Sequence, residues 1–212
     1  MSDAFWREGF GPLLPETDSV TFGDLDALHA RLKTRRYAAL VLKATQVEGG
    51  VRIPSSQYLR DAQALCRQNG TLLVLDEVQT GLYRTGPFLA SHQFEPDMDV
   101  LAKALSGGLI PVRAVLMSDG IYDSAYTSFK KAIVHTSTYS ENALAMRAGL
   151  ASLEALDVEN AGEQATQLGA WLRGRLVERL TAYEMIREIR GIGMLTGIEF
   201  SSASQTPPAS AV

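Results

Sequence analysis

The sequence of 212 residues has one cysteine, Cys66. A single cysteine excludes an internal disulfide and indicates a reducing compartment. The chain also lacks a run of about 18 apolar residues, the length needed to span a bilayer, and it does not begin with a basic segment followed by an apolar one. We therefore expect a soluble cytoplasmic protein with no membrane partner.

The chain also has no strong excess of positive or negative charge. The chain has 20 Lys and Arg against 24 Asp and Glu, a net charge of −4, and its densest basic run is short, residues 33–36. No basic surface is expected, so nucleic acid is not an expected partner. Histidine, cysteine and carboxylates do not fall at metal-ligand spacings, so no metal site is expected. Hydrophobic residues make up 46% of the chain and charged residues 21%, which is typical of a globular protein.

Short apolar runs alternate with longer segments of helical period. This pattern is typical of an α/β fold with a mostly parallel sheet flanked by helices. In the last helix, the residues expected to face inward are Leu168, Trp171, Leu172, Leu176 and Leu180. We expect buried strands at residues 38–42 and 72–75, because both are apolar without alternation, and further strands at 100–102, 112–117, 186–190 and 194–200. Helices are expected at 25–32, 58–66, 144–156 and 163–183, capped or ended by Asp24, Ser55, Gly70 and Asn142.

Polar residues follow the second predicted strand directly. Open α/β sheets bind ligands beyond the carboxyl ends of their strands, so Asp76, Glu77 and Gln79 are candidate site residues. From this segment alone, a carboxylate that caps the next turn is an equally supported interpretation.

An amine, Lys103, follows the third predicted strand, with Gly107 and Gly108 just beyond it. An amine held in apolar surroundings loses its proton more readily and can form a Schiff base with a carbonyl group. The alternative is a lysine that extends into solvent beside an ordinary Gly-Gly turn.

Hydroxyl groups gather at residues 135–140, ahead of the helix expected to begin near Asn142. Hydroxyls and a helix N-terminus suit a phosphate, although capping of the helix by Ser140 or Asn142 explains the same residues. A second glycine-rich stretch, Gly191–Gly197, has the wrong spacing for a dinucleotide loop and is followed by a β-like pattern, so we interpret it as a turn between strands.

These segments in this order resemble the class III aminotransferases. The resemblance rests on residues 75–81 (LDEVQTG), 83–86 (YRTG), 101–108 (LAKALSGG) and 135–138 (HTST), and it extends from about Phe10 to Phe200. Members of this family are pyridoxal 5′-phosphate enzymes of fold type I and include the ornithine and other ω-amino transaminases. The resemblance implies transfer of an amino group from an ω-amine or amino acid to a 2-oxo acid.

The resemblance also implies the roles of individual residues. Lys103 would hold the cofactor as an internal aldimine and then carry the proton between the substrate and the cofactor. Asp76 would pair with the pyridine nitrogen and keep it protonated, so that the ring accepts electrons. The remaining roles are Val78 packing on the ring, Gln79 bonding the phenolic oxygen, Glu48 acting in substrate binding or gating, and Thr138 reaching the phosphate held by the neighbouring subunit of a homodimer.

The sequence departs from the family pattern at several positions. Lys43 and Ala44 stand where members usually have Glu-Pro, and Val47 replaces a usual glycine. Arg113 replaces a small residue, and a bulky cation near a packed strand is expected to disturb the site.

Family members also extend beyond both ends of the resemblance, so the fold-type I large domain is expected to be incomplete. We expect residues 1–157 to form part of the pyridoxal-phosphate-binding large domain, 158–200 the beginning of a C-terminal small domain, and 201–212 a disordered tail. Two alternatives to an aminotransferase stay open: a truncated, catalytically silent homologue or partner chain that needs a second polypeptide, and an aminomutase, racemase or decarboxylase on the same fold.

Overall fold

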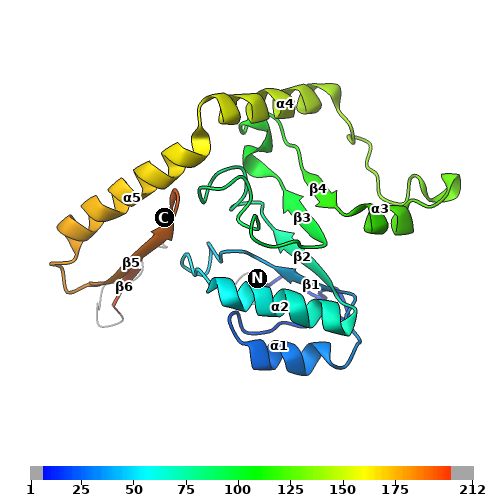
Figure 1. Ribbon diagram of the computed structural model, residues 1–212, viewed down its shortest axis with the longest axis horizontal. Helices are drawn as coiled ribbons and strands as arrows, with labels where there is room; N and C mark the ends of the chain where they lie inside the picture. The colour runs from blue at the N-terminus through cyan, green and yellow to red at the C-terminus, as the bar shows by residue number, and fades with distance from the viewer. Residues whose placement is uncertain (1–6, 202–212) are drawn as a thin grey trace.

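A four-stranded sheet forms the centre of the chain. The computed structural model describes residues 7–201, so the predicted tail lies outside the described residues apart from Ser201. The strands β1 (Ala39–Leu42), β2 (Leu72–Asp76), β3 (Met98–Leu101) and β4 (Ala114–Met117) lie in that order in the sheet (Figure 1). Both β1–β2 and β2–β3 are parallel and β3–β4 is antiparallel, which confirms a mostly parallel sheet.

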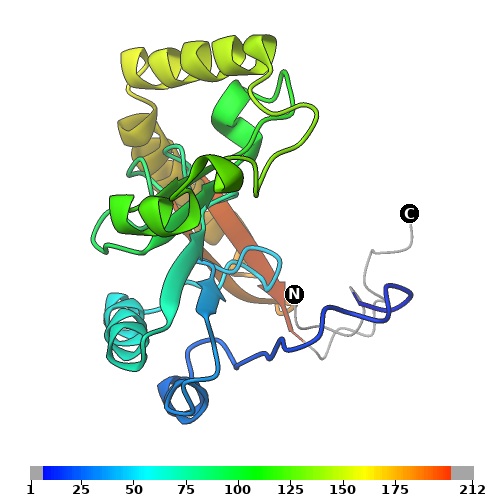
Figure 2. The ribbon, with the colours of Figure 1, turned by 90° about the vertical axis from the view of Figure 1, so that its right-hand side faces the viewer.

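Two helices cover one face of this sheet. Helices α1 (Leu25–Leu32) and α2 (Ser56–Asn69) lie side by side beneath it (Figures 1 and 2). The predicted caps are confirmed, because the Asp24 side chain accepts a hydrogen bond from the Ala27 amide and Ser55 accepts one from the Tyr58 amide. Gly70 ends α2 at φ 70°, a left-handed conformation that glycine adopts without a steric penalty.

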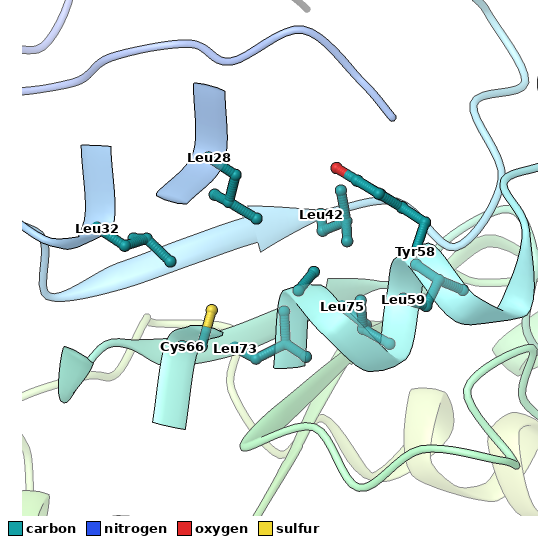
Figure 3. Packing of buried hydrophobic residues seen from close by; sticks show 9 residues of the cluster. Leu28, Leu32, Leu42, Tyr58, Leu59, Cys66, Leu73 and Leu75 are labelled. Carbon is teal, nitrogen blue, oxygen red and sulfur yellow. The ribbon is translucent and has the colours of Figure 1, made fainter. Parts of the chain in front are cut away.

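The main core lies between this helix pair and the sheet. Leu73 and Leu75 of β2 are 3% and 0% exposed, and each such burial contributes about 1.5–3 kcal/mol. The opposite face of the sheet is open at Val41, which is 68% exposed, so the prediction of a strand buried throughout is wrong at that residue. Neither α1 nor α2 covers that face. Figure 3 shows nine residues of this core, of which Leu28, Leu32, Leu42, Tyr58, Leu59, Cys66, Leu73 and Leu75 are labelled.

The long helix α4 (Ala143–Val158) packs against the segment that follows β3. A short 3₁₀ helix, η2 (Lys103–Ser106), comes directly after that strand and lies under α4. A second apolar cluster joins Leu82, Leu101 and Leu105 with Leu153 and Leu156 of α4. The chain between η2 and α4 holds β4, α3 (Asp119–Ala125) and the short 3₁₀ helix η3 (Phe129–Lys131).

The last three elements form a helix and hairpin beside the sheet. Strands β5 (Ile186–Ile192) and β6 (Leu195–Phe200) are antiparallel and lie along α5 (Ala161–Leu180) (Figure 1). The turn predicted within the glycine-rich stretch is confirmed, since it joins these two strands. Within residues 7–201, no helix is long and apolar enough to cross a membrane.

The predicted inward face of α5 is wrong at Leu168 and Trp171, whereas Leu172, Leu176 and Leu180 are half-buried. Leu168 is 50% and Trp171 63% exposed, whereas the small residues Ala165 and Gly169 are buried. A Cβ added to Gly169 would collide with the carbonyl group of Gly193 in the hairpin. The hairpin therefore contacts α5 at its small residues, and Leu168 and Trp171 remain exposed.

The hairpin is also bonded to two distant loops. The Met194 amide donates to the carbonyl of Arg84 at 3.0 Å. The Arg190 Nε donates to the carbonyl of Gly50 at 2.7 Å, although the two residues are 140 positions apart in the sequence. These bonds join the hairpin to the loops that follow β1 and β2.

Candidate active site

The carboxyl ends of the three neighbouring strands β1, β2 and β3 meet at one edge of the sheet. Leu42 is registered with Leu75, and Asp76 is registered with Val100. Lys43, the residue that follows β1, is therefore placed beside Asp76. Lys103 follows β3 two residues after its end. The sheet thus brings an acid and two amines to the edge at which open α/β sheets bind ligands.

The Asp76 carboxylate is fixed by two hydrogen bonds. Its Oδ1 accepts from the Val78 amide at 3.1 Å, which closes a local turn. Its Oδ2 accepts from the Lys43 ammonium at 2.7 Å, and the two side chains are 28% and 27% exposed. An ionised carboxylate offers about four acceptor positions. Asp76 can therefore accept a further hydrogen bond from a ligand.

Gln79 lies in the same turn, and its side chain has an unused polar atom. The Oε1 atom is buried and has no hydrogen-bond partner within residues 7–201. Leaving a buried polar atom without a partner costs about 1–3 kcal/mol. An amide supplies both donors and an acceptor, so Gln79 suits a ligand with a phenolic oxygen. Val78 is half-buried beside it. Asp76, Val78 and Gln79 therefore fit, in that order, the nitrogen, the face and the phenolic oxygen of a pyridoxal ring.

A buried carboxylate, Glu77, holds this turn in place. Its side chain is 1% exposed, and its Oε1 accepts from the Ser91 amide at 2.6 Å while its Oε2 accepts from the Thr80 hydroxyl. The Glu77 amide donates to the carbonyl of Val100 in β3 at 3.0 Å. The sequence marked Glu77 only as a second carboxylate after a strand. Its supporting role depends on Ser91, which is 14 residues away.

Asp99 adds a second buried carboxylate near Glu77. It is 9% exposed, and its Oδ1 has no hydrogen-bond partner among the described residues. The pKa of Asp99 is raised to about 6, because burial and, to a smaller extent, the negative charge of Glu77 raise it more than a hydrogen bond from Ser91 lowers it. Asp99 is registered with Leu75, so its side chain lies on the face of the sheet opposite Asp76. This carboxylate therefore belongs to the support of the site.

Lys103 begins η2 on the surface of the chain. Its side chain is exposed, so the prediction of apolar surroundings is wrong for this chain. The apolar residues on either side, Leu101 and Leu105, turn into the cluster under α4, and the lysine between them does not. Its φ is 49°, a left-handed conformation that costs a non-glycine residue about 1–2 kcal/mol. Such strain is concentrated at functional sites.

Two of the predicted site residues are not joined to this cluster. Glu48 is exposed in the loop after β1, and Thr138 is exposed in the segment between η3 and α4. Their roles stay predictions. The capping interpretation for the hydroxyl-rich segment is confirmed at Asn142, whose side chain accepts from the Ala145 amide at 3.0 Å. Ser140 accepts from the Ser137 amide at 2.9 Å within that segment.

The departures from the family pattern have different outcomes. Arg113 is exposed immediately before β4, so its charge is not buried, and its expected effect on the site stays a prediction. Lys43 instead lies in the site and bonds Asp76. The rule that selected Asp76 and Lys103, a polar residue directly after an apolar strand, applies to Lys43 as well and could have found it.

The sheet defines an α/β protein whose carboxyl edge carries an acid, an amide and an amine. The family model for class III aminotransferases matches residues 7–211. The chain belongs to the class III aminotransferases, a family of pyridoxal-phosphate enzymes, and this confirms the resemblance drawn from the motifs.

Curated and solved relatives agree with this assignment. The chain is 37% identical to the ornithine aminotransferase of Exiguobacterium, over 96% of this chain and 50% of that protein. It is 38% identical to the putrescine aminotransferase of Pectobacterium atrosepticum, over 92% of this chain and 43% of that protein. The ornithine aminotransferase of Toxoplasma gondii, whose structure has partial occupancy of pyridoxal phosphate at its active site, superposes with a TM-score of 0.88 at 36% identity over 95% of this chain and 47% of that one. An (S)-enantioselective ω-transaminase from Thermomicrobium roseum superposes with a TM-score of 0.86 at 30% identity, over 94% and 49% of the two chains.

These structural neighbours confirm the predicted fold type I architecture. The chain spans about half the length of the relatives it matches.

Proposed function

We propose that the chain provides the ring-binding part of an aminotransferase that moves an amino group from an ω-amine or amino acid to a 2-oxo acid. The observation that supports it is that Asp76, Gln79 and Lys103 follow the carboxyl ends of the neighbouring strands β2 and β3, with Gln79 Oε1 buried and without a partner among residues 7–201. The names of the relatives make ornithine and putrescine the first amino donors to test.

Each residue has a separate task in this proposal. Pyridoxal phosphate, when bound, supplies a carbonyl group that receives the donor's nitrogen and a ring that accepts electrons. Lys103 would hold the cofactor through its amine and would carry a proton from the donor carbon to the cofactor. Asp76 holds the ring nitrogen side through hydrogen bonding, Val78 packs on the ring face, and Gln79 bonds the phenolic oxygen.

Two further residues complete the proposal. Glu48 acts in substrate binding or gating from its exposed loop after β1. Thr138 bonds the cofactor phosphate of a second copy of the chain in a homodimer. Its exposure supports this role, because a side chain that serves another subunit does not pack within its own chain. In this proposal residues 1–157 belong to the large domain and residues 158–200 to the small domain.

A second candidate is a chain that binds the cofactor but is catalytically silent without another polypeptide. The observation that favours it is the exposure of large apolar side chains, such as Phe129 at 97%, Tyr139 at 84% and Leu109 at 80%. Exposed apolar surface of this kind is typical of an interaction site.

The test is the first half of the transfer, measured on this chain. The chain is mixed with pyridoxal phosphate and then with ornithine or putrescine, and pyridoxamine phosphate is quantified by chromatography. The proposal predicts formation of pyridoxamine phosphate with the wild type and none above background with Lys103→Ala. Cofactor bound at Lys103 without pyridoxamine phosphate supports the silent-chain candidate. A release of CO₂ or a racemised donor without amino transfer supports other chemistry on the same fold.

A further inference from the structure

The salt bridge between Lys43 and Asp76 gives the nitrogen side of this site an unusual charge. The Lys43 Nζ lies 2.7 Å from Asp76 Oδ2, and both side chains are about three-quarters buried. The register of β1 and β2 holds the pair together, because Leu42 lies level with Leu75 and both following residues leave the core side of the sheet. The contact is therefore built by strand pairing and does not depend on a flexible loop.

Lys43 is not in a position to replace Lys103 as the covalent amine. In pyridoxal the ring nitrogen and the carbon that carries the aldehyde lie at opposite ends of the ring. An amine bonded to Asp76 is therefore beside the nitrogen end when Asp76 binds the nitrogen. This geometry leaves Lys43 an electrostatic role.

We propose that Lys43 is a positioning residue that shares the Asp76 carboxylate with the cofactor nitrogen and lowers the proton affinity of that nitrogen. A carboxylate alone favours a protonated ring, because opposite charges attract at low dielectric. With Lys43 bonded to it, the pair has no net charge, and the ammonium repels a second cation at the same oxygens. The inference rests on the proposed function, since it requires the cofactor to be held by Asp76 and Lys103.

The other charged groups near Asp76 do not cancel this effect. Glu77 follows Asp76, but its carboxylate is buried and bonded to Ser91 and Thr80. Asp99 of β3 is level with Leu75, on the other side of the sheet. Lys103 adds a further positive charge at the end of the same strand until it binds the cofactor. Lys43 is therefore the group whose removal changes the charge bonded to Asp76.

The chemical consequence concerns the ring as an electron acceptor. An unprotonated pyridine nitrogen withdraws electrons less strongly than a protonated one. Lys43 thus sets the strength of the electron sink in this chain. A family member with a carboxylate at that position lacks this cation.

The experiment measures protonation of the ring nitrogen directly. The chain is loaded with pyridoxal phosphate labelled with ¹⁵N in the ring, and the nitrogen chemical shift is followed by NMR across the pH range in which the chain stays folded. We expect the midpoint of the titration to rise by about one pH unit in Lys43→Met, a tenfold gain in proton affinity. Lys43→Gln, which keeps a hydrogen bond to Asp76 but loses the charge, is expected to shift in the same direction. Lys43→Arg, which keeps the positive charge, is expected to keep the wild-type midpoint.

A matched control and a second readout separate the possible failures. Lys33→Met removes a cation that is exposed at the end of α1, and its midpoint is expected to equal that of the wild type. Reduction with borohydride reports whether the cofactor is bound to Lys103 in each variant. Equal midpoints in the wild type, Lys43→Met and Lys43→Gln, with Lys103 still labelled, overturn this inference alone. A shift in Lys43→Met but not in Lys43→Gln also overturns it, since charge would then not be the cause. No label at Lys103 in the wild type overturns the proposed function and this inference together.

Discussion

The buried carboxylate of Asp99 is expected to destabilise the chain at neutral pH. Its side chain is 9% exposed, one of its oxygens has no partner among residues 7–201, and burial raises its pKa from 3.8 to about 6. A raised pKa means that the folded state binds the proton more tightly than the unfolded state. The stabilising contribution is therefore complete below about pH 4 and is lost as the pH rises through about 6.

The size of the effect follows from the difference in pKa. About two units, at 1.36 kcal/mol each, correspond to about 3 kcal/mol between the protonated and ionised forms. Asp99→Asn removes the charge and keeps the shape of the side chain. We expect this variant to be about 2 kcal/mol more stable than the wild type at pH 8, and the two to be similar at pH 4.

Urea-induced unfolding followed by far-UV circular dichroism measures this difference at several pH values. Asp123→Asn is the matched control, because Asp123 is exposed on α3 and its loss is expected to change the stability by less than about 0.5 kcal/mol. The reasoning is refuted if Asp99→Asn is no more stable than the wild type at pH 8, or if its stability keeps the same dependence on pH between 4 and 8.

Three further predictions concern the hairpin, the thiol and the support of the site. Gly193→Ala is expected to detach the hairpin from the rest of the chain, since φ there is 52° and a Cβ would lie 2.5 Å from the Arg84 carbonyl oxygen. Hydrogen exchange of the β5 and β6 amides should therefore become faster. In the control Gly174→Ala, where a Cβ has nothing within 4 Å, the exchange should stay unchanged. Burial raises the pKa of the Cys66 thiol to about 11, so Ellman's reagent at pH 8 should react with it only as fast as the chain unfolds, and rapid reaction in the folded chain would contradict this. Glu77→Ala leaves the Ser91 amide and the Thr80 hydroxyl without their partner and should cost about 3 kcal/mol in the same unfolding assay; a loss below about 1 kcal/mol would contradict the supporting role.

The sequence predicts those parts of the fold that depend on neighbouring residues. Asp24, Ser55 and Asn142 cap helices at the expected places, because a cap needs only its own side chain and an amide three residues on. Leu168 and Trp171 were assigned to the wrong side of α5 because periodicity defines a face but not the element that covers it. The hairpin covers the small residues of that helix, and a pattern of large apolar residues does not reveal this.

The candidate site was predicted in part for the same reason. Asp76, Gln79 and Lys103 each follow a strand, so local sequence selects them. The bond between Lys43 and Asp76 joins residues 33 positions apart, and it depends on which strands pair and in which register. The exposure of Lys103 likewise depends on how α4 packs over η2, which no local pattern contains.

The central claim is that the cofactor's carbonyl group is captured by one particular amine of this chain. The most direct measurement is borohydride reduction of the chain after it has been saturated with pyridoxal phosphate, followed by peptide mapping by mass spectrometry. We predict one label per chain, at Lys103, and its loss in Lys103→Ala. Labels spread over several lysines, or the same labelling in the wild type and the variant, would contradict the account.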